Sequence, residues 1–303
     1  MAPGLTLSSW LWVVLTIAAA AGQTLRNALQ KELTATLGTV GATHVRFLFG
    51  LPFGLLFLAL LVAVTGQAPP AINSAMVGWT MLAALAQIGG TGLLLAAMRE
   101  RSFVVSTAYA KTEPVQVAVF GIAFLGEQLT TALSIAILIG TLGVVIMSWP
   151  KQTAGEIFSW QPAALGITSG ALFAIAAVGF RGAIKALAAS NFVLAASITL
   201  TVALLTQTIV LSLYLVARER ASLMAILRGW RQSIWAGFLG ALASQFWFLA
   251  FALETAAKVR TLALIEILFA QMVSRRIFQQ RLTSREVAGI LLVVASIALL
   301  LNA

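Results

Sequence analysis

Long apolar runs follow one another along almost the whole chain, and this pattern limits the possible fold more than any other feature. Apolar residues make up 60% of the 303 residues and charged residues only 9%. A helix needs roughly 20 apolar residues to cross the hydrocarbon core of a bilayer. Runs of this kind begin near Trp10, Gly41, Ala75, Ser102, Leu129, Pro162, Phe192, Ile234, Leu262 and Val287. The pattern predicts an all-α integral membrane protein with about ten transmembrane helices.

These runs leave only short loops, which excludes several classes of protein. Ten helices at about 1.5 Å per residue use nearly the whole chain, so no room remains for a nucleotide-binding domain or an extramembrane catalytic domain. The net charge of +10 lies in short loops, where basic residues set orientation and contact lipid headgroups; we predict no nucleic-acid partner. With no cysteine, no aspartate and one histidine, we predict no metal, no cofactor and no enzymatic activity.

The chain contains an internal repeat. The segment from Phe124 to Thr131 resembles the segment from Phe278 to Ser284, and an offset of 153 residues also aligns Glu113 with Glu266. An offset of 155 residues aligns Arg26 with Arg181. We therefore divide the chain into residues 1–150 and 151–303, joined by a linker from Trp149 to Trp160. Five spans in each half give the halves opposite orientations, an inverted repeat typical of secondary transporters.

At these residues the chain resembles the drug/metabolite transporter superfamily, specifically its EamA-type members. The resemblance rests on Glu113-Pro114 in span four, on the element Gly126-Glu127-Gln128-Leu129-Thr130, and on the glycines of span five, Gly140 and Gly143. The second half differs, because Gln279-Gln280 replaces Gly-Glu and no proline follows Glu266. The resemblance implies two five-helix repeats, with spans four and nine lining a central cavity, and export as the commoner direction.

Loop charge predicts the orientation, because every loop is short enough for the positive-inside rule. The face with both termini carries four basic residues: Arg181, Lys185, Lys258 and Arg260. The other face carries thirteen: Arg26, Lys31, Arg99, Arg101, Lys151, Arg218, Arg220, Arg228, Arg231, Arg275, Arg276, Arg281 and Arg285. The count predicts both termini outside the cell, in the inner membrane, whereas the resemblance implies both termini in the cytoplasm.

Glu113 and Glu266 are the leading candidates for a substrate site. An ionisable group inside a span costs about 2.5 to 3.5 kcal/mol at the membrane centre, so such groups are functional candidates. Each carboxylate can bind a cationic group or a coupling proton. Alternatively, each pairs with Lys111, Arg46 or Arg260 and serves only helix packing.

Further polar and aromatic residues complete the predicted site. Lys111 either meets a substrate carboxylate or pairs with a carboxylate on a neighbouring helix. The predicted wall residues, which alternatively serve helix packing, are Gln87, Tyr109, Gln245 and Trp247. Pro114 removes a backbone hydrogen bond inside span four, which makes either a gating kink or a tolerated bend. We expect Arg46 to reach the membrane interface, and Arg26 and Arg181 to anchor the ends of spans one and six.

These residues predict a secondary transporter of a small organic metabolite that works by alternating access, with the bilayer and a coupling proton or counter-substrate as further partners. Export is the direction that the resemblance implies. Carboxylate and ammonium groups in one site suit a zwitterion, so an amino acid or a related metabolite is the first candidate. An exporter of hydrophobic or quaternary cations is the alternative, and a membrane-embedded protein that transports nothing is the third possibility. We predict no particular oligomeric state.

Overall fold

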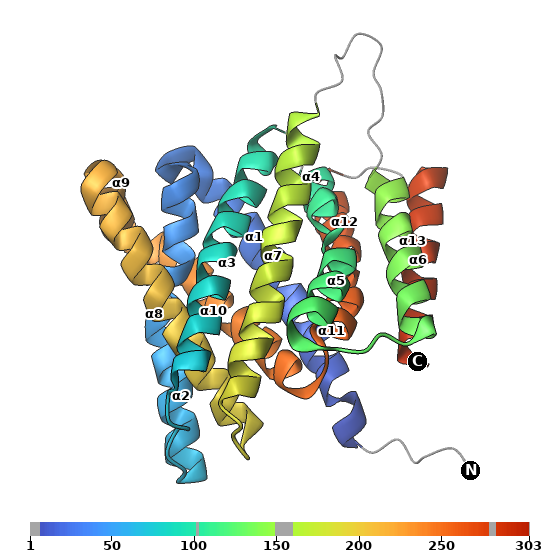
Figure 1. Cartoon of the computed structure of the whole chain (residues 1–303). Helices are drawn as coiled ribbons and strands as arrows, with labels where there is room; N and C mark the ends of the chain where they lie inside the picture. Colours follow the sequence, from blue (N-terminus) through green and yellow to red (C-terminus); the bar gives the residue numbers. More distant parts are fainter. Residues whose placement is uncertain (1–6, 101–102, 149–159, 279–282, 303) are drawn as a thin grey trace.

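The chain folds into a bundle of α-helices (Figure 1). The computed structural model describes residues 7–100, 103–148, 160–278 and 283–302, and no strand occurs in these ranges. The helices are α1 (Leu7–Leu48), α2 (Leu51–Thr65), α3 (Ser74–Glu100), α4 (Phe103–Ala110), α5 (Glu113–Leu125), α6 (Thr131–Ser148), α7 (Gln161–Ala186), α8 (Phe192–Arg218), α9 (Arg220–Arg228), α10 (Trp230–Leu253), α11 (Ala256–Leu262), α12 (Ile265–Phe278) and α13 (Ser284–Leu301). Helices satisfy the backbone polar groups within one segment, as hydrocarbon surroundings require. The predicted all-α fold class is confirmed.

Six helical segments in the described ranges are long and apolar enough to cross a membrane, against the ten runs predicted. Two predicted spans merge into the first segment, Trp10–Thr65. Here α1 continues through a kink at Gly38, where φ is 68° and ψ is 176°, a conformation that glycine adopts without steric cost. The predicted span five is a shorter apolar helix, and the spans predicted near Ser102 and Leu262 are each divided into two short helices.

The two divided spans break in the same way, one residue or two before a glutamate. α4 ends at Ala110, and the amide of Lys111 bonds to the carbonyl of Ala108 at 3.0 Å. α11 ends at Leu262, and the amide of Leu264 bonds to the carbonyl of Thr261 at 3.1 Å. These are tight turns of the 3₁₀ type, which often mark functional sites inside helices. Each break places a glutamate in the first turn of the following helix.

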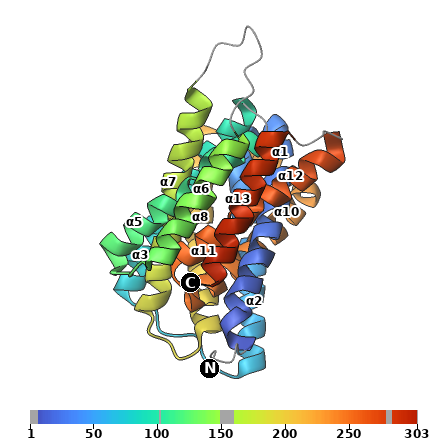
Figure 2. The ribbon, with the colours of Figure 1, turned by 90° about the vertical axis from the view of Figure 1, so that its right-hand side faces the viewer.

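Small residues bring the long helices close together. α1 packs along α10, α3 along α7, and α6 along α13, and the last pair lies side by side in Figure 2. A Cβ atom added to Gly143 would lie 2.8 Å from the carbonyl oxygen of Gly289, so the backbones of α6 and α13 meet at two glycines. The hydroxyl of Ser296 also donates to the carbonyl of Ala136 at 2.6 Å. Such close contacts are typical of helix association in membranes, where burial of apolar surface gives no driving force.

The start of α1 and the end of α13, next to the termini, lie towards one end of the bundle, and α9 lies at the opposite end (Figure 1). The divided helices run antiparallel, because α4 packs against α12 while α5 packs against α11. Figure 1 shows the junctions between these helices in the middle of the bundle. The predicted linker, apart from Trp160, and the segment Gln279-Gln280 lie outside the described residues.

Candidate functional site

Two buried ion pairs connect the two divided helices. The Nζ atom of Lys111 lies 2.8 Å from Oε2 of Glu266, and Nε of Arg260 lies 2.6 Å from Oε1 of Glu113. The four side chains are at most 6% exposed. The break between α4 and α5 therefore supplies one base, Lys111, and one acid, Glu113. The segment α11–α12 supplies their partners, Glu266 and Arg260.

Each carboxylate lies at the start of a helix. Glu113 is the first residue of α5 and Glu266 the second residue of α12. The free amides and the positive dipole end of a helix interact favourably with a negative side chain there. The helix breaks therefore place both glutamates where the backbone helps to balance their charge in the bundle interior.

A hydrogen-bonded chain extends the Lys111–Glu266 ion pair towards α1 and α10. The amide of Gln23 donates to both carboxylate oxygens of Glu266, at 2.8 and 2.9 Å. The indole of Trp247 donates to Oε1 of Gln23 at 3.0 Å, and the guanidinium of Arg260 lies 4.6 Å from the centre of the Trp247 ring. A cation over an aromatic face is attracted by the ring quadrupole. Helices α1, α10, α11 and α12 are thus joined through one polar cluster.

Two further arginines are buried without a carboxylate partner. Arg26 and Arg46 are each 1% exposed. Arg26 donates to the side-chain oxygen of Asn27 at 2.6 Å, and Arg46 donates to the hydroxyls of Thr91 and Ser244 at 3.2 and 3.3 Å. No carboxylate of the described chain lies within ion-pair distance of either guanidinium. Burying a charge without a counter-charge costs several kcal/mol, roughly.

A small cavity lies among these groups. Polar atoms from α1, α3, α10 and α11 line it together with aromatic rings: Gln23, Gln87, Phe173, Ala176, Ala177, Phe180, Ser244, Trp247, Phe248, Phe251 and Arg260. Its size suits about one water molecule. Its lining, a few polar groups among aromatic side chains, has the composition typical of sites for small organic molecules.

The structure brings some of the predicted site residues together and separates others. Glu113, Glu266 and Lys111 belong to the ion pairs, and Gln87 and Trp247 line the cavity. Gln87 also accepts a hydrogen bond of 2.7 Å from Gln207.

Gln245 and Tyr109 do not line this cavity. Gln245 donates instead to the hydroxyl of Ser197 on α8 at 2.8 Å. Tyr109 packs against the backbone of Gly166 on α7. These two predicted wall residues make helix–helix contacts, because their positions on α10 and α4 face neighbouring helices.

Pro114 lies in the first turn of α5. A proline there loses no helical hydrogen bond, because the first amides of a helix have no partner within it. Pro114 was expected to remove a backbone hydrogen bond inside span four, but α4 has already ended at Ala110 and α5 begins at Glu113. Whether Pro114 acts in gating stays a prediction.

Sequence reasoning missed Gln23 and Ser244, and it misplaced two arginines. Arg46 was expected at the interface and Arg26 at the end of a span, yet both side chains lie inside the bundle. A polar residue within an apolar run was the available signal. Near the end of a predicted span, the sequence does not distinguish a charged residue of the loop from one whose side chain lies inside the bundle. For this reason Arg26 was counted with the loops.

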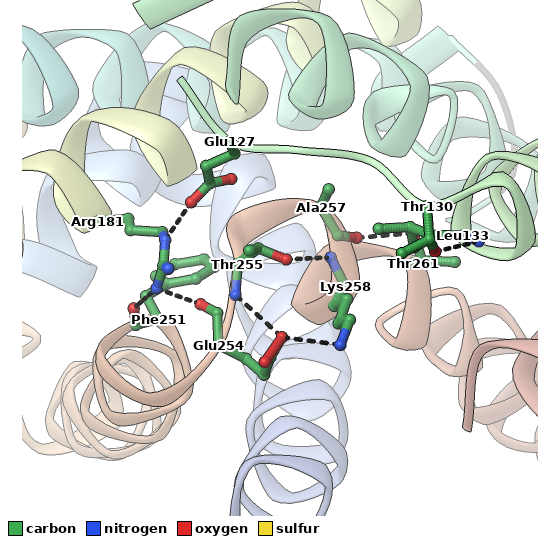
Figure 3. A network of polar contacts seen from close by, with 10 residues as sticks. All are labelled: Glu127, Thr130, Leu133, Arg181, Phe251, Glu254, Thr255, Ala257, Lys258 and Thr261. Carbon is green, nitrogen blue, oxygen red and sulfur yellow. Dashed lines mark hydrogen bonds and ion pairs between the residues drawn. The ribbon is translucent and has the colours of Figure 1, made fainter. Parts of the chain in front are cut away.

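A second polar network lies at the end of the bundle that holds the termini (Figure 3). The guanidinium of Arg181 pairs with Glu127 and donates to the carbonyls of Phe251 and Glu254. Glu127 follows Gly126, whose φ of 63° ends α5 in a left-handed turn. Arg181 on α7 therefore ties the loop after α5 to the end of α10, and Figure 3 shows its side chain between these two partners.

Comparison with known proteins finds a family similarity in the first half of the chain. Residues 10–149 match the model of the EamA-like transporter family. No functionally curated protein matches the sequence. A solved structure titled "Crystal structure of protein" is similar to this chain, with a TM-score of 0.69 and 13% sequence identity over 95% of this chain and 94% of the other. This likeness concerns the fold alone.

Proposed function

We propose that this multi-pass membrane transporter exports a small organic metabolite by alternating access. The premise is that residues 10–149 belong to the EamA-like transporter family. The direction of export follows the commoner direction in the family that the sequence resembles. In this proposal an ion gradient or exchange for a counter-substrate drives transport.

The observation that carries this proposal is the pair of ion pairs between the divided helices. Lys111 and Glu113 belong to residues 1–150, and Arg260 and Glu266 to residues 151–303, so both pairs cross between the proposed halves. Discontinuous helices with charged residues at their breaks are typical of substrate sites at the midplane of secondary transporters. The proposed substrate site is therefore the cavity beside these breaks.

The helix contacts support the proposed inverted repeat. α1 packs on α10 while α3 packs on α7, and α6 packs on α13. If α7, α8, α10, α11–α12 and α13 are the counterparts of α1, α2, α3, α4–α5 and α6, these contacts interchange under one two-fold axis. The antiparallel contacts of α4–α5 with α11–α12 fit the same axis. Rocking of one half against the other about this centre is the proposed motion.

The charges favour a solute with a carboxylate over a quaternary cation. Both glutamates already have a cationic partner, so neither carries a free negative charge for a cationic drug. An amino acid or a related zwitterion remains the proposed substrate class. The alternative, an exporter of hydrophobic cations, would require Lys111 and Arg260 to leave the carboxylates.

We assign a closing role to the network around Arg181. Arg181 and Glu127 belong to different proposed halves, and their pairing holds these halves together at the end with the termini. For the cavity to open at this end, Arg181 must release Glu127. The ion pair and the two carbonyl contacts would then re-form when the cavity closes.

The proposed orientation in the inner membrane places both termini outside the cell. Because Arg26 and Arg260 are buried, neither is counted among the basic loop residues of its face. The remaining loop charge still lies mainly at the end that carries α9, where Arg218, Arg220 and Arg228 are found. Positively charged short loops stay in the cytoplasm.

Uptake by proteoliposomes tests the proposed function. Purified protein reconstituted in liposomes should exchange internal for external radiolabelled amino acid, and Glu266→Gln should abolish the exchange. Glu100→Gln, which changes an exposed glutamate at the end of α3, is the matched control and should retain it. Absence of exchange for all amino acids, organic anions and organic cations, with folded protein in the membrane, would contradict a transporter.

A further inference from the structure

The bundle interior carries more positive than negative charge. Besides the two ion pairs, Arg26 and Arg46 are buried, so the interior cluster holds four cations and two carboxylates, an excess of two positive charges. The other buried carboxylate of the described chain, Glu127, pairs with Arg181 at the end of the bundle. Isolated charges in a low-dielectric interior are strongly unfavourable without a counter-charge. The cluster therefore lacks an anion.

Arg26 and Arg46 lie next to each other beside α10. A Cβ atom added to Gly240 would lie 2.9 Å from Cγ of Arg46 and 3.4 Å from Cδ of Arg26. The absence of a side chain at Gly240 thus makes room for two arginine side chains from different parts of α1. One turn further along α10, Ser244 accepts a hydrogen bond from Arg46 and lines the cavity.

Several guanidinium nitrogens of this cluster have no hydrogen-bond partner. Nη1 of Arg26, Nε of Arg46 and Nη1 of Arg260 are buried, and no acceptor of the described chain bonds to them. Buried polar atoms are normally satisfied, so each exception needs an explanation. An oxyanion suits these donors, because the planar guanidinium fork matches the two oxygens of a carboxylate.

We propose that Arg26 and Arg46 form the subsite that binds the carboxylate of the transported solute, and that the substrate class is a small organic carboxylate with an apolar or aromatic body. This inference rests on the proposed transport function and deepens it, because it states that an anionic group is required and an ammonium group is not. Arg46 reaches the cavity wall through Ser244. Gln23 and Arg260 also line the cavity, and both are already engaged with the glutamates.

The walls of the cavity suit such a body. Five aromatic side chains contribute to its lining: Phe173, Phe180, Trp247, Phe248 and Phe251. Aromatic rings pack well against one another and against apolar ligands. The cavity has room for about one water molecule, so it must widen as the two proposed halves move apart and the solute enters.

Three probes that share one ring and differ in charge test this inference. Phenylacetate is an anion, phenylalanine a zwitterion and phenethylamine a cation. A ligand that binds the native state raises the melting temperature of the purified full-length protein. We expect a rise with phenylacetate and no rise with phenethylamine. Stabilisation by phenethylamine alone, or by phenylalanine but not phenylacetate, would overturn the proposal.

Variants distinguish a binding role of the arginines from a structural one. Arg26→Gln and Arg46→Gln should each raise the Kd for phenylacetate at least tenfold, while the unliganded protein should melt at a higher temperature because a buried unpaired charge is removed. Arg46→Lys keeps the charge but loses the fork, and should bind with intermediate affinity. Arg228→Gln, at the exposed end of α9, is the control for net charge and should leave the Kd unchanged. Unaltered affinity in both glutamine variants would overturn the proposal.

Exchange in proteoliposomes separates failure of this inference from failure of the proposed function. If phenylacetate binds in a way that depends on both arginines but no solute is exchanged, the inferred subsite stands and the proposed transport function is contradicted. If phenylalanine exchange persists in Arg26→Gln and Arg46→Gln, the proposed transport function stands and the inferred subsite is overturned.

Discussion

Arg260 and Glu113 form a buried ion pair between two parts of the chain that are far apart in sequence, with Nε of Arg260 2.6 Å from Oε1 of Glu113. Arg260 lies on α11, before the break that precedes Glu266, and Glu113 follows the break after α4. The same geometry recurs for Lys111 and Glu266. The acid of each broken helix thus pairs with the base of the other.

Removal of one member of the Arg260–Glu113 pair should destabilise the protein more than removal of both. Glu113→Gln leaves an uncompensated guanidinium in the interior, which costs about 3–5 kcal/mol. The double variant Glu113→Gln with Arg260→Gln should recover most of this loss. Thermal unfolding of the purified protein in detergent measures the effect in a double-mutant cycle. Additive losses would show that the two residues do not stabilise each other.

Replacement of Lys111 should change the preferred charge of the substrate. Lys111→Gln leaves the carboxylate of Glu266 without its ammonium partner, although Gln23 still donates to it. We expect the exchange of zwitterions to fall about tenfold, the effect of a lost interaction of about 1.4 kcal/mol, and the exchange of organic cations to rise. Parallel uptake of phenylalanine and phenethylamine by proteoliposomes compares the two. Equal changes for both solutes would argue against a direct effect of the charge.

Alanine at the crossing of α6 and α13 should destabilise the bundle, whereas alanine on an open helix face should not. At Gly143 the new Cβ would lie 2.8 Å from the carbonyl oxygen of Gly289 and from Cβ of Leu292, an overlap that costs about 1–3 kcal/mol. At Gly78 on α3 no atom lies within 4 Å of the new Cβ, so the substitution should be neutral or stabilise by up to about 1 kcal/mol. Melting temperatures of Gly143→Ala and Gly78→Ala test the contrast, and a similar change in both would contradict it.

Loss of the Arg181–Glu127 pair should open the end of the bundle that holds the termini. The chain has no cysteine, so a single introduced cysteine reports access to the cavity without background. Ser244→Cys should react faster with a small thiol reagent added from that side when Glu127→Gln is also present. Glu100→Gln in the same cysteine background is the control. An unchanged reaction rate in the Glu127 variant would argue against a closing role of the network in Figure 3.

Much of the candidate site was predictable because charge inside an apolar run is conspicuous. Glu113, Glu266 and Lys111 were identified in this way. Pairing of the glutamates with Lys111, Arg46 or Arg260 was one of the two interpretations considered, and the partners in the structure are Lys111 and Arg260. The break after α4 had a signal in the sequence, the nearby Pro114. The break at Ala263–Leu264 has no proline, so no sequence signal marked it. Gln23, which bonds to both oxygens of Glu266, was one polar residue among several in span one.

The sequence by itself determined the environment, the helical fold class and the resemblance to a transporter family, because these depend on the amount of apolar residues, their run lengths and local motifs. Only the tertiary structure decided which side chains face the interior. In water, an apolar stripe marks the buried face of a helix. In a membrane the lipid is as apolar as the protein interior, so the pattern of Leu, Ala and Val does not distinguish the two faces. For this reason Arg26 and Arg46 were assigned to helix ends, and only the packing of α1 against α10 placed them in the bundle interior, next to each other at Gly240.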